Sequence, residues 1–322
     1  MIESLETLEA CVARRMSVPG RRRVVGASDA AILLTDFASA VLVDPDGASE
    51  VIATDERQLI SAALGDDGRV ALLEAQPSEG RWPAQVRIVD PRTGGEQTWD
   101  ADVTGSLEVG TGTGGALAWD GPSALWLACL DDASEELWVG RIDAETGELI
   151  TQGTFPDPYV ESAVRFGAVA RGRAHLEVDA GQHGGWVFVA EPGPGAQLSV
   201  RSRVPSDKVN AHLEIGADLL GLEVFGPPKL VRWRGPERVE LELPGTGFPL
   251  YLISLDAGRV MVLDDRGEAL LVDSDRMAAV GRLRVPGHTD GGQELTGAAM
   301  GSRWVTARYG DGETELALWT LP

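Results

Sequence analysis

The sequence predicts an all-β protein, a seven-bladed β-propeller of four-stranded antiparallel blades. Two observations support this fold class. Residues 58–102 hold four short apolar runs joined by tight turns, which is the pattern of an antiparallel meander. The same meander recurs along the chain, and its second strands begin at intervals of roughly forty to fifty residues, a spacing typical of propeller blades.

The meander at residues 58–102 shows the sequence pattern that each blade is expected to follow. Turn residues separate its apolar runs: GDDG at 65–68 follows the first run, and DPRTG at 90–94 follows the third. Aspartate caps such turns, and glycine takes the positive φ angle that they require. Seven meanders of this kind are predicted, at residues 24–54, 58–102, 112–156, 163–205, 209–244, 248–286 and 295–321.

The two ends of the chain complement each other. The last meander, within 295–322, has only three strands, whereas the strand predicted at 11–18 has no blade of its own. That strand ends at Pro19, as the fourth strands of other blades end at proline. We therefore expect it to complete the last blade, which removes an open edge. The blades account for residues 1–322 as a single domain.

The N-terminal region and the cysteine count indicate the compartment. Apolar residues at every third position (Ile2, Leu5, Leu8) predict a short helix over 2–9, and acidic residues stand where a secretory signal would be basic. Two cysteines are too few for a disulfide framework. Abundant arginine, alanine and glycine beside scarce lysine are typical of GC-rich, bacterial coding. We therefore expect a cytoplasmic, bacterial protein.

The net charge of −22 limits the kinds of partner. Such a charge opposes binding to nucleic acid or to an anionic membrane through a broad surface. No apolar run approaches the length that crosses a membrane. Solubility alone accounts for a strongly acidic surface, but acidity also favours a basic partner.

On these turns and spacings the chain resembles seven-bladed propellers of the WD-repeat and YVTN type. The best matches are the turn Asp66-Asp67-Gly68 and the DPRTG turn at 90–94. The resemblance covers nearly the whole chain and implies the propeller fold. The Gly-His and Trp-Asp pairs that mark WD repeats do not recur from blade to blade: Gly-His occurs once, at 287–288, and Trp-Asp twice, at 99–100 and 119–120. The resemblance therefore assigns no functional subfamily.

Two other motifs have simple structural explanations. The stretch GTGTGG at 110–115 contains a GxGxxG pattern, but a dinucleotide site needs a helix next, and residues 116–119 are predicted to form a strand. The turns at 89–94 and 142–147 are similar to turns of quinone-dependent propeller dehydrogenases, which repeat a docking tryptophan. Trp99 stands near the required offset in one blade only, so we interpret both turns as hairpins.

Metal-dependent hydrolysis is the alternative that the sequence leaves open. Propeller lactonases bind a divalent metal in the central channel through Glu, Asp and Asn side chains. This chain has a single asparagine, Asn210, and its four histidines show no metal-ligand spacing. The alternative is therefore a lactonase-like hydrolase or a small-molecule sensor with a carboxylate site in the channel. The residues themselves predict no catalytic group, no metal ligand and no cofactor.

Most tryptophans are predicted to pack between neighbouring blades, because they stand on predicted strands and bury a large apolar area. Trp82 differs, since it lies in the longest second-to-third-strand loop, residues 76–84. A binding role or packing within the loop would explain it equally well. The tryptophans predicted to be core residues are Trp119, Trp126, Trp138, Trp186, Trp233, Trp304 and Trp319.

The predicted binding face carries the loops between second and third strands and the connections between blades. Carboxylates are frequent there, basic residues are few, and some aromatic residues accompany them. Charge would steer an Arg- or Lys-rich protein surface to this face, and the aromatic residues would supply much of the affinity. The sequence thus favours a non-enzymatic protein-binding or scaffold propeller. The candidate partner-binding residues are Trp82, Asp131, Asp132, Glu135, Glu136, Tyr159, Phe248, Asp264, Asp265, Asp311 and Glu313.

Overall fold

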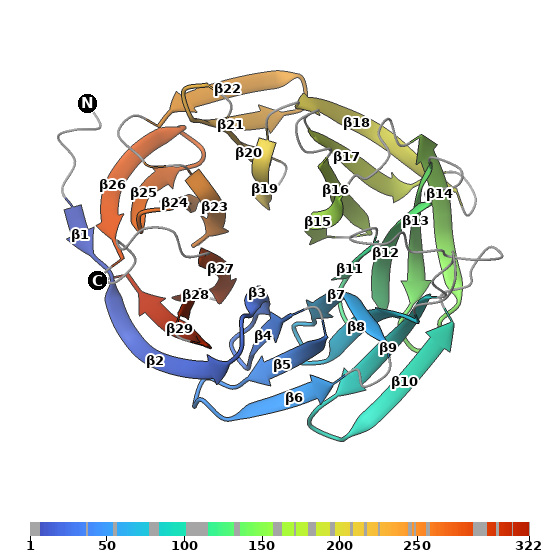
Figure 1. The fold of residues 1–322 in the computed structure, drawn as a ribbon. Coiled ribbons are helices and arrows are strands. Elements are labelled where there is room, and N and C mark those ends of the chain that lie inside the picture. The colour runs from blue at the N-terminus through green and yellow to red at the C-terminus, as the bar shows by residue number, and fades with distance from the viewer. Residues whose placement is uncertain are drawn as a thin grey trace. The chain divides into compact units, whose positions relative to one another are not determined.

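The computed structural model confirms the all-β fold class. The described residues form seven antiparallel meanders of four strands, the blades of a seven-bladed β-propeller (Figure 1). Each blade corresponds to one of the meanders expected from the sequence. The structure describes the chain apart from residues 1–6, 37, 54–56, 77–83, 101–114, 132–135, 157–162, 171, 180–184, 194–196, 207–208, 216–217, 225, 244–246, 248, 256–257, 286–294, 301–302, 311 and 322.

Blades one to four occupy the first part of the chain. Blade one consists of β3 (Arg23–Ala27), β4 (Ile32–Thr35), β5 (Ser39–Val43) and β6 (Ser49–Ala53). Blade two consists of β7 (Gln58–Leu64), β8 (Val70–Ala75), β9 (Ala84–Asp90) and β10 (Gly95–Asp100). Blade three consists of β11 (Gly115–Trp119), β12 (Ala124–Asp131), β13 (Glu136–Asp143) and β14 (Leu149–Pro156). Blade four consists of β15 (Ala163–Ala170), β16 (Arg173–Asp179), β17 (Gly185–Pro192) and β18 (Leu198–Ser206).

Blades five to seven occupy the rest. Blade five consists of β19 (Val209–Ile215), β20 (Asp218–Glu223), β21 (Lys229–Arg234) and β22 (Glu237–Glu242). Blade six consists of β23 (Pro249–Ser254), β24 (Arg259–Asp264), β25 (Glu268–Asp273) and β26 (Ala278–Arg284). Blade seven takes β27 (Leu295–Met300), β28 (Arg303–Gly310) and β29 (Glu313–Thr320) from the C-terminus and β2 (Cys11–Pro19) from the N-terminus.

The chain forms two compact units. Unit one comprises Met1–Asp29, Asp44–Ser49 and Lys208–Pro322, and unit two comprises Ala30–Val43 and Glu50–Asp207. Blades two, three and four therefore lie in unit two, and blades five, six and seven lie in unit one.

The N-terminal strand completes the last blade, as the sequence predicts. Strand β2 pairs antiparallel with β29 over nearly its whole length, from Cys11 opposite Thr320 to Pro19 opposite Glu313 (Figure 1). This pairing gives blade seven its fourth strand. It also supplies β29 with backbone partners that an edge strand would lack.

The helix predicted over residues 2–9 is wrong where the structure describes it. Thr7–Glu9 form a short strand, β1, which pairs in parallel with Arg282–Arg284 of β26. Ala10 follows, is buried, and donates its amide hydrogen to the carbonyl of Arg284 at 3.0 Å. A helix of two turns is only marginally stable, whereas the edge of blade six offers backbone partners. The N-terminal segment therefore binds two blades of unit one, blade six through β1 and blade seven through β2.

The hairpin turns follow the predicted chemistry. The third-to-fourth-strand turns of blades two and three each close with a backbone bond of 2.9 Å, from Gly94 to Asp90 and from Gly147 to Asp143. Both glycines have positive φ angles, 68° and 72°. That conformation costs a residue with a side chain about 1–2 kcal/mol, so glycine fixes the turn at these positions.

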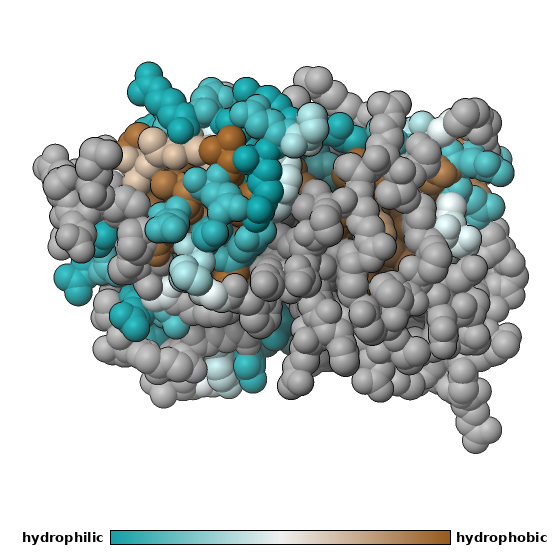
Figure 2. All heavy atoms as spheres, turned by 90° about the horizontal axis from the view of Figure 1, so that it is seen from above, coloured by the Kyte–Doolittle hydropathy of each residue, from teal (hydrophilic) through white to brown (hydrophobic). Residues whose placement is uncertain are grey.

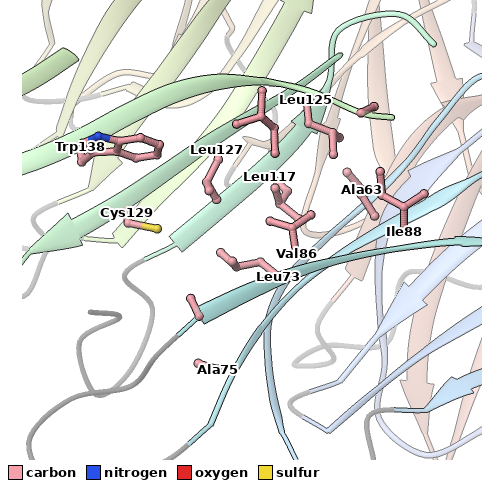
Figure 3. Close-up of a cluster of buried hydrophobic side chains, with 14 residues drawn as sticks. Ala63, Leu73, Ala75, Val86, Ile88, Leu117, Leu125, Leu127, Cys129 and Trp138 are labelled. Carbon is pink, nitrogen blue, oxygen red and sulfur yellow. The ribbon is translucent and has the colours of Figure 1, made fainter. Parts of the chain in front are cut away.

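The core of unit two lies between consecutive blades. Figure 3 shows the cluster between blades two and three, where Leu73 and Val86 meet Leu117 and Leu127. Trp138 belongs to the same cluster. Trp126 is fully buried in the next cluster, with residues of blade four.

The core of unit one is built in the same way. Trp304 and Trp319 are fully buried with residues of blade six, and the Trp319 indole donates to the Thr306 hydroxyl at 2.8 Å. The tryptophan prediction is therefore confirmed for Trp126, Trp138, Trp304 and Trp319. Trp119 and Trp233 are only half-buried, and the side chain of Trp186 lies outside the described part of the structure.

Candidate interaction face

The second-to-third-strand turns define one end of each blade, which we call the loop end. In a four-stranded meander the connection to the next blade leaves from this same end, because successive strands reverse direction. The predicted partner-binding residues belong to the loop ends of blades two to four in unit two and of blades five to seven in unit one.

The loop end of blade three holds the densest predicted set of carboxylates. Asp131 ends β12, Glu136 begins β13, and the two are directly paired across the strands. The side chains of this pair lie outside the described part, as do Asp132 and Glu135 entirely. The register places residues 131 and 136, which flank this connection, directly opposite each other. Also outside the described residues are the candidates Trp82, Tyr159, Phe248 and Asp311.

Asp264 has a structural position that the sequence did not reveal. Its side chain is buried and accepts three backbone hydrogen bonds, from Gly247 at 2.6 Å, Arg266 at 2.9 Å and Glu268 at 2.8 Å. These bonds tie the β24–β25 hairpin to the connection that precedes β23. An aspartate held in this way stabilises the turn and presents no carboxylate to solvent.

Asp265 and Glu313 are the predicted carboxylates that the structure places in solvent. Asp265 is exposed in the turn between β24 and β25. Glu313 is exposed at the start of β29, where its carboxylate accepts a hydrogen bond from the Ser17 hydroxyl. Both lie at loop ends of unit one. On the face displayed in Figure 2, hydrophilic side chains cover much of the described surface, and hydrophobic ones show between them.

Three arginines escaped the sequence analysis. Arg21 and Arg22 follow β2 after Gly20, at the loop end of blade seven, and Arg23 begins β3. The guanidinium of Arg21 lies 5.8 Å from the ring centre of Tyr309, within the range of a cation–π contact. The signal was present in the sequence, since a run of three arginines stands out in a strongly acidic chain. This part of unit one therefore carries both signs of charge.

Several buried carboxylates are neutralised by arginine. Glu74 with Arg87, Glu177 with Arg165 and Asp218 with Arg234 form ion pairs with nitrogen–oxygen distances of 2.6, 2.6 and 2.5 Å. Each pair joins the second strand of its blade to a neighbouring strand. The Asp218 carboxylate raises the pKa of Arg234 above its already high usual value. These contacts give the three acids a role in strand pairing.

Metal binding and phosphate binding gain no support from the described geometry. Within the described residues no group of three or more His, Cys, Asp or Glu side chains is arranged to hold a metal ion. Gly115, the last glycine of the GxGxxG pattern, begins strand β11, so the residues after it form no helix. A Cβ atom at this glycine would lie 2.6 Å from Leu73, so close packing of blades two and three explains the glycine.

The comparisons leave the family open. Neither the known protein families nor the curated protein sequences contain a match to this chain. In the portion of the chain that the structure describes, no helix is long and apolar enough to cross a bilayer.

Proposed function

We propose that this chain is a non-enzymatic interaction propeller that presents acidic loop ends to a basic protein partner. The fold supports this proposal, because rigid blades hold variable loops in fixed positions. The net charge of −22 supports it as well, because it raises the rate of encounter with a positively charged surface. The two cysteines, neither of which forms a disulfide, fit a reducing cytoplasm as the setting.

The observation that carries the proposal is the contrast between two kinds of acidic residue. Glu74, Glu177 and Asp218 are buried and paired with arginine, and Asp264 is buried on backbone amides. Asp265 and Glu313 at the loop ends are exposed. A partner's lysine or arginine can approach an exposed carboxylate, whereas it cannot reach a buried one.

The physical mechanism is electrostatic steering followed by local packing. Exposed charge pairs contribute little individually, on the order of 0–1 kcal/mol, so affinity would require several of them together with aromatic contacts. The arginines after β2 would help to orient the partner, because they repel its basic surface at blade seven. Association should weaken as ionic strength rises, since salt screens the field beyond about 8–10 Å.

The test begins with affinity capture from lysate of the native host, washed at low and then at high salt. A single partner released by salt is expected. Its binding to purified protein is then measured for a quadruple variant, Asp131→Lys, Asp132→Lys, Glu135→Lys and Glu136→Lys, which should abolish binding.

A matched control separates a specific face from overall charge. Asp66, Glu145, Glu148 and Glu237 are exposed at the ends of the blades opposite the loop ends. Changing these four to lysine alters the net charge equally and should preserve binding at fixed salt. Equal loss in both variants, or capture of no partner, would reject the proposal. In the latter case calcium, zinc and chelator effects on thermal stability would test the hydrolase alternative.

A further inference from the structure

A hollow of about 290 Å³ opens on blade seven of unit one, where three strands meet. It is lined by β2, β29 and β28, so it forms only when the N-terminal strand has joined the C-terminal ones. Its volume is at the small end of the range for ligand pockets. The hollow lies away from the predicted acidic candidates, apart from its neighbour Glu313.

The strand register determines which side chains meet there. Ser17 pairs with Glu315, which pairs with Arg308, and Arg15 pairs with Ala317 one step along the same face. Side chains two residues apart in a strand point to the same side, so these groups share one surface. The small side chains of Ser17 and Ala317 leave the space that the longer ones surround.

Two opposite charges in this hollow have no partner among the described residues. Arg15 and Glu315 are exposed, and neither forms a hydrogen bond or ion pair within the part of the chain that the structure describes. Their neighbours differ: Arg14 is paired with Asp46 at 3.0 Å, and Glu313 accepts from Ser17. A guanidinium binds a carboxylate with two parallel hydrogen bonds, and a carboxylate binds an ammonium group.

One apolar side chain completes this face of the hollow. Ala317 is buried on the same face as Arg15 and Ser17, whereas the side chains of Met16 and Leu316 alternate to the opposite face, where Met16 lies beside Gly47. The hollow therefore combines two cationic groups (Arg15 and Arg308), one anionic group (Glu315) and a small apolar floor at Ala317. These requirements are met together by an α-amino acid with an aliphatic side chain.

We infer that this blade-seven hollow binds a free aliphatic α-amino acid, with its carboxylate on Arg15, its ammonium group on Glu315 and its side chain over Ala317. This site is independent of the proposed acidic interaction face, and either can fail without the other.

The experiment uses the full chain and three probes: L-leucine, L-leucine amide and N-acetyl-L-leucine. The amide lacks the carboxylate, as a peptide N-terminus does, and the acetyl compound lacks the ammonium group, as a peptide C-terminus does. In calorimetric titrations L-leucine should bind about tenfold more tightly than either analogue, because each loses one charge-assisted contact. Equal affinity for an analogue would reassign the hollow to a peptide end and overturn the inference.

Variants assign each charge to its residue. Arg15→Gln should reduce L-leucine affinity to that of the amide, and Glu315→Gln should reduce it to that of the acetyl compound. Arg276→Gln is the control, because Arg276 is an 81% exposed arginine on a turn of blade six. It should leave affinity unchanged. Loss of affinity in the control, or none in both hollow variants, would overturn the inference.

Discussion

The indole ring of Trp99 lies directly over Gly147. A Cβ atom at position 147 would come within 2.3 Å of Trp99 Cδ1 and 2.5 Å of Cγ. Trp99 belongs to β10, the outer strand of blade two, and Gly147 belongs to the third-to-fourth-strand turn of blade three. The tryptophan therefore docks one blade onto the turn of the next.

Gly147→Ala should destabilise the protein by about 2–5 kcal/mol, since a left-handed φ costs about 1–2 and overpacking costs about 1–3. Gly94→Ala is the matched control, because Gly94 has nearly the same φ (68°) and no atom lies near its added Cβ. Measured by denaturant unfolding, the control should lose only about 1–2 kcal/mol of the free energy of unfolding. In a Trp99→Ala background, the cost at Gly147 should fall to the control value; an unchanged cost would show that the docking contact is unimportant.

Met277 takes the position that glycine holds in the turns after Asp90 and Asp143. Its φ is +48°, and its side chain is buried. Met277→Ala should cost about 2–5 kcal/mol of lost packing and keep the strain. Met277→Gly should be about 1 kcal/mol more stable than the alanine variant, because glycine relieves the strain.

Met261, which is buried in the middle of β24, is the control for the relative stability of the glycine and alanine variants. There Met261→Gly should be less stable than Met261→Ala by about 0.5–1 kcal/mol, the usual order within a strand. Thermal unfolding of the four variants measures both differences. If the glycine variant were less stable than the alanine variant at both sites, the backbone strain at Met277 would be contradicted.

Asp120 fastens blade three to blade four. Its carboxylate is buried and accepts from Arg141 Nε at 2.7 Å and from the backbone amide of Gly172 at 3.1 Å. Asp120→Ala should cost about 2–4 kcal/mol, because both donors lose their acceptor in a largely buried site. The exposed pair Arg14–Asp46 offers a comparison, and Asp46→Ala should cost about 0–1 kcal/mol. Similar unfolding midpoints for the two variants would refute this role of Asp120.

Asp143 gives the stability an acid dependence. Backbone hydrogen bonds from Thr146 and Glu145 lower the pKa of Asp143 below its usual value. Its contribution to the free energy of unfolding is therefore complete above about pH 3.9, the pKa in the unfolded chain, and is lost as the pH falls through the lower folded value. Asp143→Asn should lower the melting temperature at pH 7 more than at pH 2–3, measured by circular dichroism. The control is Asp66→Asn, at an exposed turn carboxylate. Its effect on the melting temperature should be the same at pH 7 as at pH 2–3.

The two cysteines should differ in reactivity. Cys11 is exposed on β2, whereas Cys129 is buried and its burial raises the pKa of the thiol to about 12. A maleimide should modify one thiol in the native protein and two in denaturant, as counted by mass spectrometry. Cys11→Ser should leave none reactive in the native state; rapid labelling of Cys129 would contradict its burial.

The local pattern of the chain determined the fold class. Alternation of apolar runs with Asp- and Gly-containing turns was enough to place the blades, and the missing fourth strand of the last blade pointed to β2. Trp126, Trp138, Trp304 and Trp319 were placed in the core for a local reason also, since a large apolar side chain on a strand is buried wherever blades meet. Each of these features could be predicted from the pattern of residues in a short stretch of sequence.

Contacts between segments far apart in the sequence were decided by the tertiary structure. Thr7–Glu9 has a helical spacing but becomes a strand, because the edge of β26 supplies its backbone partners. Asp264 resembles its exposed neighbour Asp265 in sequence, yet it is buried because the amide of Gly247 comes within 2.6 Å. The hollow at Arg15 and Glu315 requires two strands separated by about the whole chain. The spacing of residues in the sequence does not predict these long-range contacts, because they depend on which strands and blades pack together.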